Sequence, residues 1–284
     1  MKPDANTALY CLFGRPARHS LSPAMHNAAF ARMGMNAVYL AFEPDKPLNA
    51  IRAMRALHIP GASVTIPFKR EILDHLDEID SLAEKIGSVN TLINDDGIIK
   101  GFNTDGYGAV KALQVNGVRI NGRKILVIGN GGAARAIAFS LLEEKAEVLI
   151  SGRDEKKAGF LASDLSRYFT GVESGGIDTL TGGTLDDYHI IINTTPVGMF
   201  PDIGSSPLDP SLLNPRLTVF DIVYNPVRTR LLDSAESAGC RIIPGTDMLL
   251  YQGVRQFELW TSAPAPVETM REALMGNIKA RGNR

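Results

Sequence analysis

A glycine-rich turn between an apolar strand and a helix is the segment that most directly predicts chemistry. The run Lys124–Ile128 is rich in β-branched residues, and a helix with a long apolar face follows it. The residues of the turn between them are Gly129, Asn130, Gly131, Gly132 and Ala133. Glycines permit a tight turn and let backbone N–H groups approach a pyrophosphate, which the helix N-terminus then stabilises. In this strand–turn–helix context the pattern GxGxxA predicts a dinucleotide-binding site.

The residues at the end of the following strand indicate whether the cofactor is NAD or NADP. NAD enzymes usually carry an acid there for the ribose 2′-hydroxyl, whereas NADP enzymes offer cations to the 2′-phosphate. Here Gly152 is followed by Arg153, whose planar guanidinium suits a phosphate, and Lys157 could add charge. Asp154 and Glu155 oppose this, either by neutralising Arg153 or by bonding a ribose, and both also suit a helix start. The segment favours NADP, with NAD as the alternative.

Four further segments place polar side chains at the ends of apolar strands, where α/β proteins hold their ligands. They are His19–Ser22, Val64–Lys69, Val89–Thr91 and Asn103–Asp105. Ser20 and Ser22 precede a helix, so their hydroxyls lie at a ready anion site. We expect Ser22 to be the N-cap of that helix, with Pro23 in its first turn.

These segments, in their order and spacing, resemble the signature motifs of the shikimate dehydrogenase family. Three later segments fit the same pattern, namely Asn193–Met199, Asp221–Tyr224 and Gly245–Gln252, so the resemblance spans nearly the whole chain. It implies an NADP-dependent oxidoreductase that reduces 3-dehydroshikimate to shikimate, reversibly, in chorismate and aromatic amino acid biosynthesis.

The resemblance also implies roles for individual residues. Lys69 and Asp105 correspond to a catalytic pair, and such a pair would stabilise and protonate the alkoxide that forms when hydride reaches a ketone carbon. The implied substrate ligands are Ser20 and Ser22 for the carboxylate, together with Thr65, Asn90, Asp105, Tyr224 and Gln252. The implied cofactor contacts are the turn Gly129–Ala133, Gly152, Arg153 and Lys157, together with Thr194, Ile222, Gly245 and Met248.

Two motifs depart from the family pattern. Ser63 stands where the family often has Asn, before the Val-Thr of the lysine motif. Gly152-Arg153-Asp154 stands where Asn-Arg-Thr is common, which removes two polar contacts to the adenosine phosphate. The acid at this point resembles relatives that also accept NAD.

Strands and helices alternate in both halves of the chain, which predicts an α/β fold with largely parallel, covered sheets. The predicted strands are Tyr10–Phe13, Ala37–Phe42, Gly61–Ile66, Ser88–Asn94, Ile98–Phe102, Lys124–Ile128, Glu147–Ser151, Ile190–Asn193, Thr218–Asp221 and Arg241–Ile243. Gly171–Thr184 is expected to be an irregular surface connection. The family fold implies a substrate-binding domain of residues 1–105 and 245–284, a Rossmann-like NADP-binding domain of residues 106–244, and an active site in the cleft between them.

Composition excludes several other classes. The chain has 284 residues and a net charge of −1, which gives no global field for nucleic acid or an anionic membrane. Two distant cysteines make a disulfide framework or zinc site improbable, and the five histidines show no ligand spacing, so we expect no metal. No apolar run approaches transmembrane length. We expect a cytoplasmic protein, either monomer or homodimer.

Two other functions stay open from the sequence. The pocket residues also fit a quinate/shikimate dehydrogenase that uses NAD or NADP. A non-catalytic dinucleotide-binding sensor is a further alternative, although such a protein would be expected to lose Lys69 or Asp105, and both are present.

Overall fold

The structure of the chain is a computed structural model that describes residues 2–181 and 185–282. The chain forms two compact units, Met1–Thr104 with Gln252–Arg284, and Asp105–Tyr251. The helix α10, Gly245–Thr261, begins in the second unit and ends in the first. The units therefore divide inside a continuous helix, whereas the boundary expected from the sequence stands at the beginning of that helix.

The first unit is built on a six-stranded mixed sheet with the order β2–β1–β3–β5–β6–β4. β1 is parallel to β2 and β3, while β5 is antiparallel to both β3 and β6. The strands are β1 (Ala8–Phe13), β2 (Ala37–Phe42), β3 (Gly61–Val64), β4 (Glu78–Ile79), β5 (Thr91–Asp95) and β6 (Ile98–Phe102). The helices are α1 (Ser22–Arg32), α2 (Pro47–Ala56), α3 (Phe68–Glu71), the 3-10 turn η1 (Ile72–His75), α4 (Ser81–Ile86) and α11 (Val267–Gly282).

The parallel pairing of β1 and β3 brings two of the polar segments to one edge of this sheet. Phe13 lies opposite Val64, so the chain after each strand leaves from the same edge. A Cβ atom at Gly14 would lie 2.1 Å from Cγ2 of Thr65. Only glycine therefore lets the segment that leads to Ser20 pass directly over Thr65.

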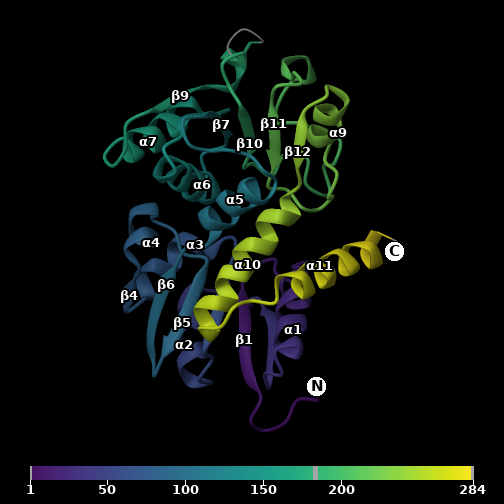
Figure 1. Cartoon of the computed structure of the whole chain (residues 1–284). Helices are drawn as coiled ribbons and strands as arrows, with labels where there is room; N and C mark the ends of the chain where they lie inside the picture. The colour runs from purple at the N-terminus through teal and green to yellow at the C-terminus, as the bar shows by residue number, and fades with distance from the viewer. Residues whose placement is uncertain (1, 182–184, 283–284) are drawn as a thin grey trace. The chain divides into compact units, whose positions relative to one another are not determined.

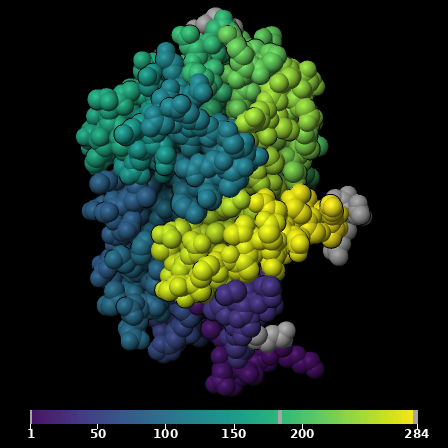
Figure 2. Space-filling model, in the orientation of Figure 1, coloured from purple at the N-terminus to yellow at the C-terminus, as the bar shows by residue number. Residues whose placement is uncertain are grey.

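The C-terminal helices complete the first unit. α11 packs along α1 (Figure 1), and Figure 2 shows this yellow C-terminal segment lying against the purple N-terminal one. In α10 the Trp260 ring lies 5.4 Å from the Tyr10 ring, and its indole N–H donates to the Leu92 carbonyl over 3.0 Å. Gly61 makes room for the indole, because a Cβ atom there would be 2.4 Å from Cδ1 of Trp260.

The second unit is built on a six-stranded, fully parallel sheet with the order β12–β11–β10–β7–β8–β9. The strands are β7 (Lys124–Ile128), β8 (Glu147–Gly152), β9 (Val172–Gly176), β10 (Ile190–Asn193), β11 (Thr218–Asp221) and β12 (Arg241–Ile243). The helices are α5 (Asp105–Val115), α6 (Gly132–Glu143), α7 (Glu155–Leu165) and α9 (Arg230–Ser237), with 3-10 turns η2 (Ile177–Thr179) and η3 (Pro210–Leu212). Counted from β7, the spatial order is 3-2-1-4-5-6, that of a dinucleotide-binding Rossmann sheet. The predicted α/β fold class is confirmed.

The expectation of an irregular connection over Gly171–Thr184 is wrong for its first part. Val172–Gly176 forms β9, which pairs in parallel with β8 at the edge of the sheet beside α7 (Figure 1). The strand is rich in Gly and Ser and is only partly covered, so it carries none of the apolar alternation that marks a strand in a sequence. The last part of that expectation, residues 182–184, lies outside the described residues.

No helix among residues 2–181 and 185–282 combines the length and the hydropathy that a transmembrane crossing requires.

Candidate active site

The glycine-rich turn lies where the strand order of the second sheet reverses. Gly129 has φ +122°, a conformation that favours glycine, and its N–H donates to the Ser151 carbonyl over 2.7 Å. On the other side, the N–H and the hydroxyl of Thr194 both donate to the Ile128 carbonyl, over 2.8 and 2.7 Å. The ends of β7, β8 and β10 thus meet at the switch point, which is where parallel α/β sheets bind their ligands.

The start of α6 has the donor set that a pyrophosphate requires. Gly131 is its N-cap, no side chain caps the helix, and no acid lies in its first turn, which contains Gly132 and Ala133. A Cβ atom at Gly131 would meet nothing within 4 Å, so the helix N-terminus has open space before it. A helix N-terminus with uncapped N–H groups and space in front is an anion site. The residues present therefore fit a dinucleotide.

Arg153 at the end of β8 is exposed, and its acidic neighbour is engaged elsewhere. The Asp154 carboxylate is the N-cap of α7, where it accepts from the Lys157 N–H over 3.1 Å and lies 3.3 Å from the Lys157 ammonium. These interactions with Lys157 hold the pKa of Asp154 below its usual value. Within residues 2–181 and 185–282 no ion pair or side-chain hydrogen bond involves Arg153. Of the roles left open by the sequence, the structure shows Asp154 capping the helix.

The loops after β10 and β11 are tied together by a buried carboxylate, Asp221. It accepts hydrogen bonds from the Thr229 hydroxyl at 2.7 Å, the Asn193 amide at 2.9 Å and the Val223 N–H at 3.0 Å. These bonds hold the loops that carry Thr194, Ile222 and Tyr224. From the sequence, Asp221 is recognisable only as part of a motif, because its hydrogen-bond partners are up to 28 residues away in the chain.

The first turn of α10 packs on the same loop. A Cβ atom at Gly245 would lie 2.4 Å from the carbonyl oxygens of both Ile222 and Val223, so the backbone approaches more closely than any other residue allows. Met248 follows in the same helix and is buried. The predicted cofactor residues Ile222, Gly245 and Met248 therefore lie on adjoining segments.

Burial raises the pKa of Asp221 to about 6, although the Thr229 hydroxyl, the Val223 N–H and the Asn193 amide each lower it. In the unfolded chain an aspartate titrates near pH 4, about two units lower. Between about pH 4 and pH 6 the folded protein therefore holds a proton that the unfolded chain has lost. The stability that the protonated Asp221 contributes is therefore fully present below about pH 4 and is lost as the pH rises through about 6.

Replacing Asp221 with Asn should remove this dependence. Relative to wild type, the variant should gain up to about 3 kcal/mol of unfolding free energy when the pH is raised from 4 to 7, because a neutral amide pays no desolvation cost for charge. Urea unfolding of both proteins at the two pH values measures the difference. Asp209→Asn is the matched control: the Ser211 N–H lowers the pKa of Asp209, so its contribution to stability changes only below about pH 4, and that variant should follow wild type between pH 4 and pH 7. A parallel pH dependence in wild type and Asp221→Asn would contradict the assignment.

The serine segment before α1 differs from expectation at its cap. The N-cap is Leu21, and the expectation that Ser22 occupies this position is wrong: Ser22 is the first residue of the helix and its side chain forms no cap hydrogen bond. Ser20 Oγ instead accepts from the Ser22 N–H over 3.2 Å. Pro23 does lie in the first turn, as predicted. The local fold places both hydroxyls at the helix N-terminus while leaving Ser22 without a capping role.

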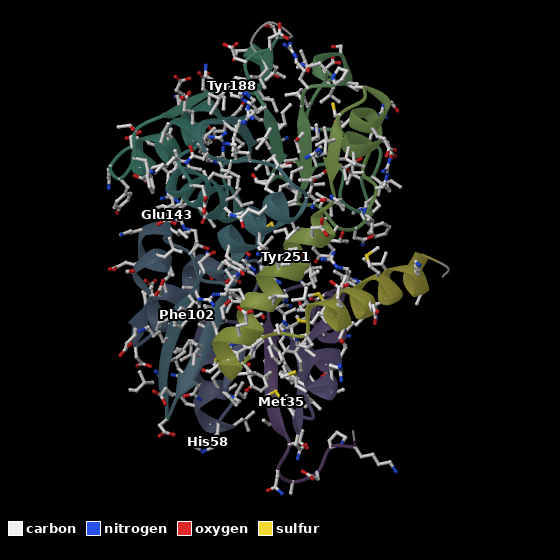
Figure 3. The ribbon with its side chains drawn as sticks, viewed as in Figure 1. Met35, His58, Phe102, Glu143, Tyr188 and Tyr251 are labelled. Atoms are coloured by element: carbon white, nitrogen blue, oxygen red, sulfur yellow. The ribbon has the colours of Figure 1, made fainter. Side chains whose placement is uncertain are left out.

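The lysine motif and the Asn90 motif are joined through the backbone. The Val89 N–H donates to the Lys69 carbonyl over 2.8 Å, and Lys69 itself is half-buried in α3. The Asn90 N–H donates to the carbonyl of Phe102, labelled in Figure 3 at the end of β6, over 3.0 Å. The structure thus brings Thr65, Lys69 and Asn90 to one edge of the first sheet.

Asn90 also bonds to the residue before the predicted catalytic carboxylate. Its Nδ2 donates to the Thr104 hydroxyl over 3.0 Å, and Asp105 follows Thr104 as the buried first residue of α5. Gln252 lies buried in α10. Of the predicted substrate residues, Ser20, Ser22, Thr65, Asn90 and Gln252 belong to the first unit; Asp105 and Tyr224 belong to the second.

Among the described side chains, no group of three or more His, Cys, Asp or Glu residues is arranged to hold a metal ion. A carboxylate-rich or imidazole-rich metal centre is therefore not seen in the part of the chain that the structure describes.

The sequence and the structure were compared with those of known protein families. Residues 12–92 match the model of the shikimate dehydrogenase substrate binding domain, and residues 245–275 match that of the shikimate 5'-dehydrogenase C-terminal domain. The shikimate dehydrogenase (NADP(+)) of Methanosarcina barkeri is 46% identical over 277 residues, which cover 94% of this chain and 97% of that protein.

Two solved structures are similar over nearly the whole chain. A shikimate dehydrogenase in complex with NADP+ has a TM-score of 0.93 at 40% identity and covers 98% of each chain. The shikimate 5-dehydrogenase of Listeria monocytogenes in complex with shikimate and NAD has a TM-score of 0.89 at 36% identity and covers 96% of this chain and 98% of its own. With 46% identity across 94% of its length, a Rossmann switch point, and the serine, lysine and asparagine motifs in place, the chain belongs to the shikimate dehydrogenase family.

Proposed function

We propose that this protein is an NADP-dependent dehydrogenase that interconverts 3-dehydroshikimate and shikimate in the cytoplasm. Family membership supports the substrate, because the M. barkeri relative is named for this reaction. The single structural observation that supports it most is the hydrogen bond from the Val89 N–H to the Lys69 carbonyl, which joins the backbone segments of Lys69 and Asn90 at one sheet edge. A lysine and a fixed amide on adjoining segments suit a substrate that presents a ring oxygen on a reacting carbon.

The residues of this chain would divide the chemistry as follows. NADPH supplies hydride to the ring ketone carbon, and the oxygen left behind gains negative charge. The Lys69 ammonium stabilises this oxygen and donates a proton to it, and Asp105 orients the lysine or bonds the neighbouring hydroxyl. Ser20 and Ser22 hold the carboxylate at the N-terminus of α1. Thr65, Asn90, Tyr224 and Gln252 bind the ring hydroxyls.

The second unit would hold the cofactor. Gly129, Asn130, Gly131, Gly132 and Ala133 take the pyrophosphate, and Gly152, Arg153 and Lys157 take the adenosine phosphate. Thr194, Ile222, Gly245 and Met248 lie on the segments proposed to contact the nicotinamide end. The uncapped N-terminus of α6 and the open space at Gly131 support this arrangement.

The test of the proposed function is turnover of the purified protein with shikimate or quinate, each with NADP+ or NAD+, followed by the absorbance of the reduced nicotinamide. Fast turnover only with shikimate and NADP+ is expected. Comparable rates with quinate or NAD+ would move the protein to the broader quinate/shikimate dehydrogenase class. No turnover with either substrate would contradict the proposal and favour a non-catalytic sensor.

Arg153→Ala should weaken the binding of NADP+ much more than that of NAD+. We expect the KM for NADP+ to rise on the order of 10- to 100-fold, because a guanidinium–phosphate contact contributes about 1.5–3 kcal/mol, while the KM for NAD+ changes little. Arg216→Ala is the control, since Arg216 is an exposed arginine paired with Asp186 in the same unit. Equal losses for NADP+ and NAD+ would show that Arg153 only packs against the cofactor.

A further inference from the structure

A chain of buried hydrogen bonds in the first unit leads to Asn90 from four side chains that the proposed mechanism does not use. The Tyr39 hydroxyl donates to Ser63 Oγ over 2.7 Å, and the Ser63 hydroxyl donates to Gln256 Oε1 over 2.8 Å. Gln256 Nε2 donates to the Thr91 hydroxyl over 3.0 Å, and that hydroxyl donates to Asn90 Oδ1 over 2.8 Å. Every member of the chain is buried.

Two backbone groups fix the direction of these bonds. A backbone carbonyl can only accept, and Gln256 faces the Asn90 carbonyl over 3.1 Å, so the facing atom is Nε2. A backbone N–H can only donate, and the Thr104 N–H lies 2.8 Å from the side chain of Asn90, so the facing atom is Oδ1. The Thr91 hydroxyl must then accept from Gln256 and donate to Asn90. Both side-chain amides have one allowed orientation.

From this geometry we infer that Gln256 is a positioning residue for substrate recognition, which acts through Thr91 to fix the orientation of the Asn90 amide. Oδ1 accepts from Thr91 and Thr104, and Nδ2 donates to the Thr104 hydroxyl over 3.0 Å, so these bonds hold the Asn90 amide in one orientation. The inference rests on the proposed function in one respect, namely that Asn90 contacts the substrate.

Ser63 links Gln256 to Tyr39, the far end of this chain of hydrogen bonds. The family often has Asn at this position, and a serine presents only one hydroxyl hydrogen. Here that hydrogen goes to Gln256, and the Ser63 oxygen receives the Tyr39 phenol. Tyr39 in turn is stacked on the His26 ring at 4.6 Å, and burial lowers the pKa of His26 to about 3, so the stack stays uncharged.

The test compares three variants, and a fourth, Thr91→Ser, as a rescue, in steady-state assays with shikimate and NADP+. Gln256→Met keeps the length of the side chain and removes its amide, and Thr91→Val removes the connecting hydroxyl. Each should raise the KM for shikimate on the order of tenfold, the equivalent of one hydrogen bond, and leave the KM for NADP+ within about twofold. Tyr39→Phe is the matched control, because it removes one buried hydrogen bond at the far end and leaves the two backbone anchors of Gln256 and Asn90 in place.

The outcomes separate positioning from stability. A raised shikimate KM in Gln256→Met and Thr91→Val but not in Tyr39→Phe, with recovery in Thr91→Ser, supports the inference. An unchanged shikimate KM in Gln256→Met and Thr91→Val, with lowered melting temperatures in all three, overturns it. If Gln256→Met does not fold, the contrast between Thr91→Val and Thr91→Ser decides alone. Wild-type protein that does not turn over shikimate would instead be a failure of the proposed function.

Discussion

Lys69→Ala is expected to lower kcat for shikimate oxidation by about 10²–10⁴-fold, the usual contribution of a positioned acid or base. Dinucleotide affinity should be retained, because the Rossmann switch point is formed by β7, β8 and β10 and contains no part of α3. The measurement is kcat and KM for both substrates, with NADPH binding followed separately by fluorescence.

Arg70, the next residue after Lys69, offers a control variant for Lys69→Ala. Arg70 lies in the same four-residue helix and is exposed, so Arg70→Ala tests the loss of a cation at almost the same place in the fold. Lys69→Arg tests the chemistry itself: it keeps the charge but replaces a compact ammonium with a planar guanidinium that does not give up its proton. We expect little recovery of kcat. Near-normal turnover in Lys69→Ala would contradict the catalytic assignment.

The Ser20→Ala/Ser22→Ala double variant should raise the KM for shikimate on the order of 100-fold or more. Two hydrogen bonds to a carboxylate contribute about 1.5–3 kcal/mol each, and the helix N-terminus cannot replace their geometry. The KM for NADP+ should stay close to that of the wild type. Steady-state kinetics at saturating cofactor measures both constants.

The two serines differ in a way that makes the single variants informative. Ser20 Oγ accepts the Ser22 N–H, so Ser20→Ala also removes a bond at the start of α1, whereas Ser22 has no capping bond to lose. Ser22→Ala is therefore the cleaner test of ligand binding. A substrate analogue with a carboxamide in place of the carboxylate should bind the wild type and the double variant alike. If the double variant preferred the carboxylate over the carboxamide as strongly as the wild type does, the role of the two serines in binding the carboxylate would be refuted. Ser237→Ala, which removes a hydroxyl that bonds within α9, is the control.

Much of the fold follows from the sequence because most of its strands are short runs rich in apolar residues that end at, or are followed by, a polar residue, glycine or proline. Ala37–Phe42, Lys124–Ile128, Ile190–Asn193, Thr218–Asp221 and Arg241–Ile243 have the predicted bounds. β9 was missed because its Val-Glu-Ser-Gly-Gly sequence has neither alternation nor buried bulk. β4 has two residues and α4 has six, both too short for a period to show.

The site was predictable where it depends on local sequence and not where it depends on distant contacts. A glycine-rich turn after a buried strand has a recognisable pattern, and the open N-terminus of α6 agrees with it. The helix start at Ser22 was misplaced by one residue, because Ser20 supplies from outside the helix the bond that an N-cap serine would make. No sequence pattern indicated a role for Gln256. Its partner Ser63 lies 193 residues earlier, so no window of sequence contains both.

The order in which the chain is synthesised has a consequence for folding. Domains usually complete in the order in which they leave the ribosome. Here the second unit is contiguous, Asp105–Tyr251, whereas the first also requires Gln252–Arg284. Until those last residues emerge, Tyr10 lacks Trp260, Leu92 lacks the indole donor, and α1 lacks α11. Of the two units, the one whose residues come first is therefore completed second, and its apolar surface along α1 and β1 stays uncovered until α10 and α11 have been synthesised.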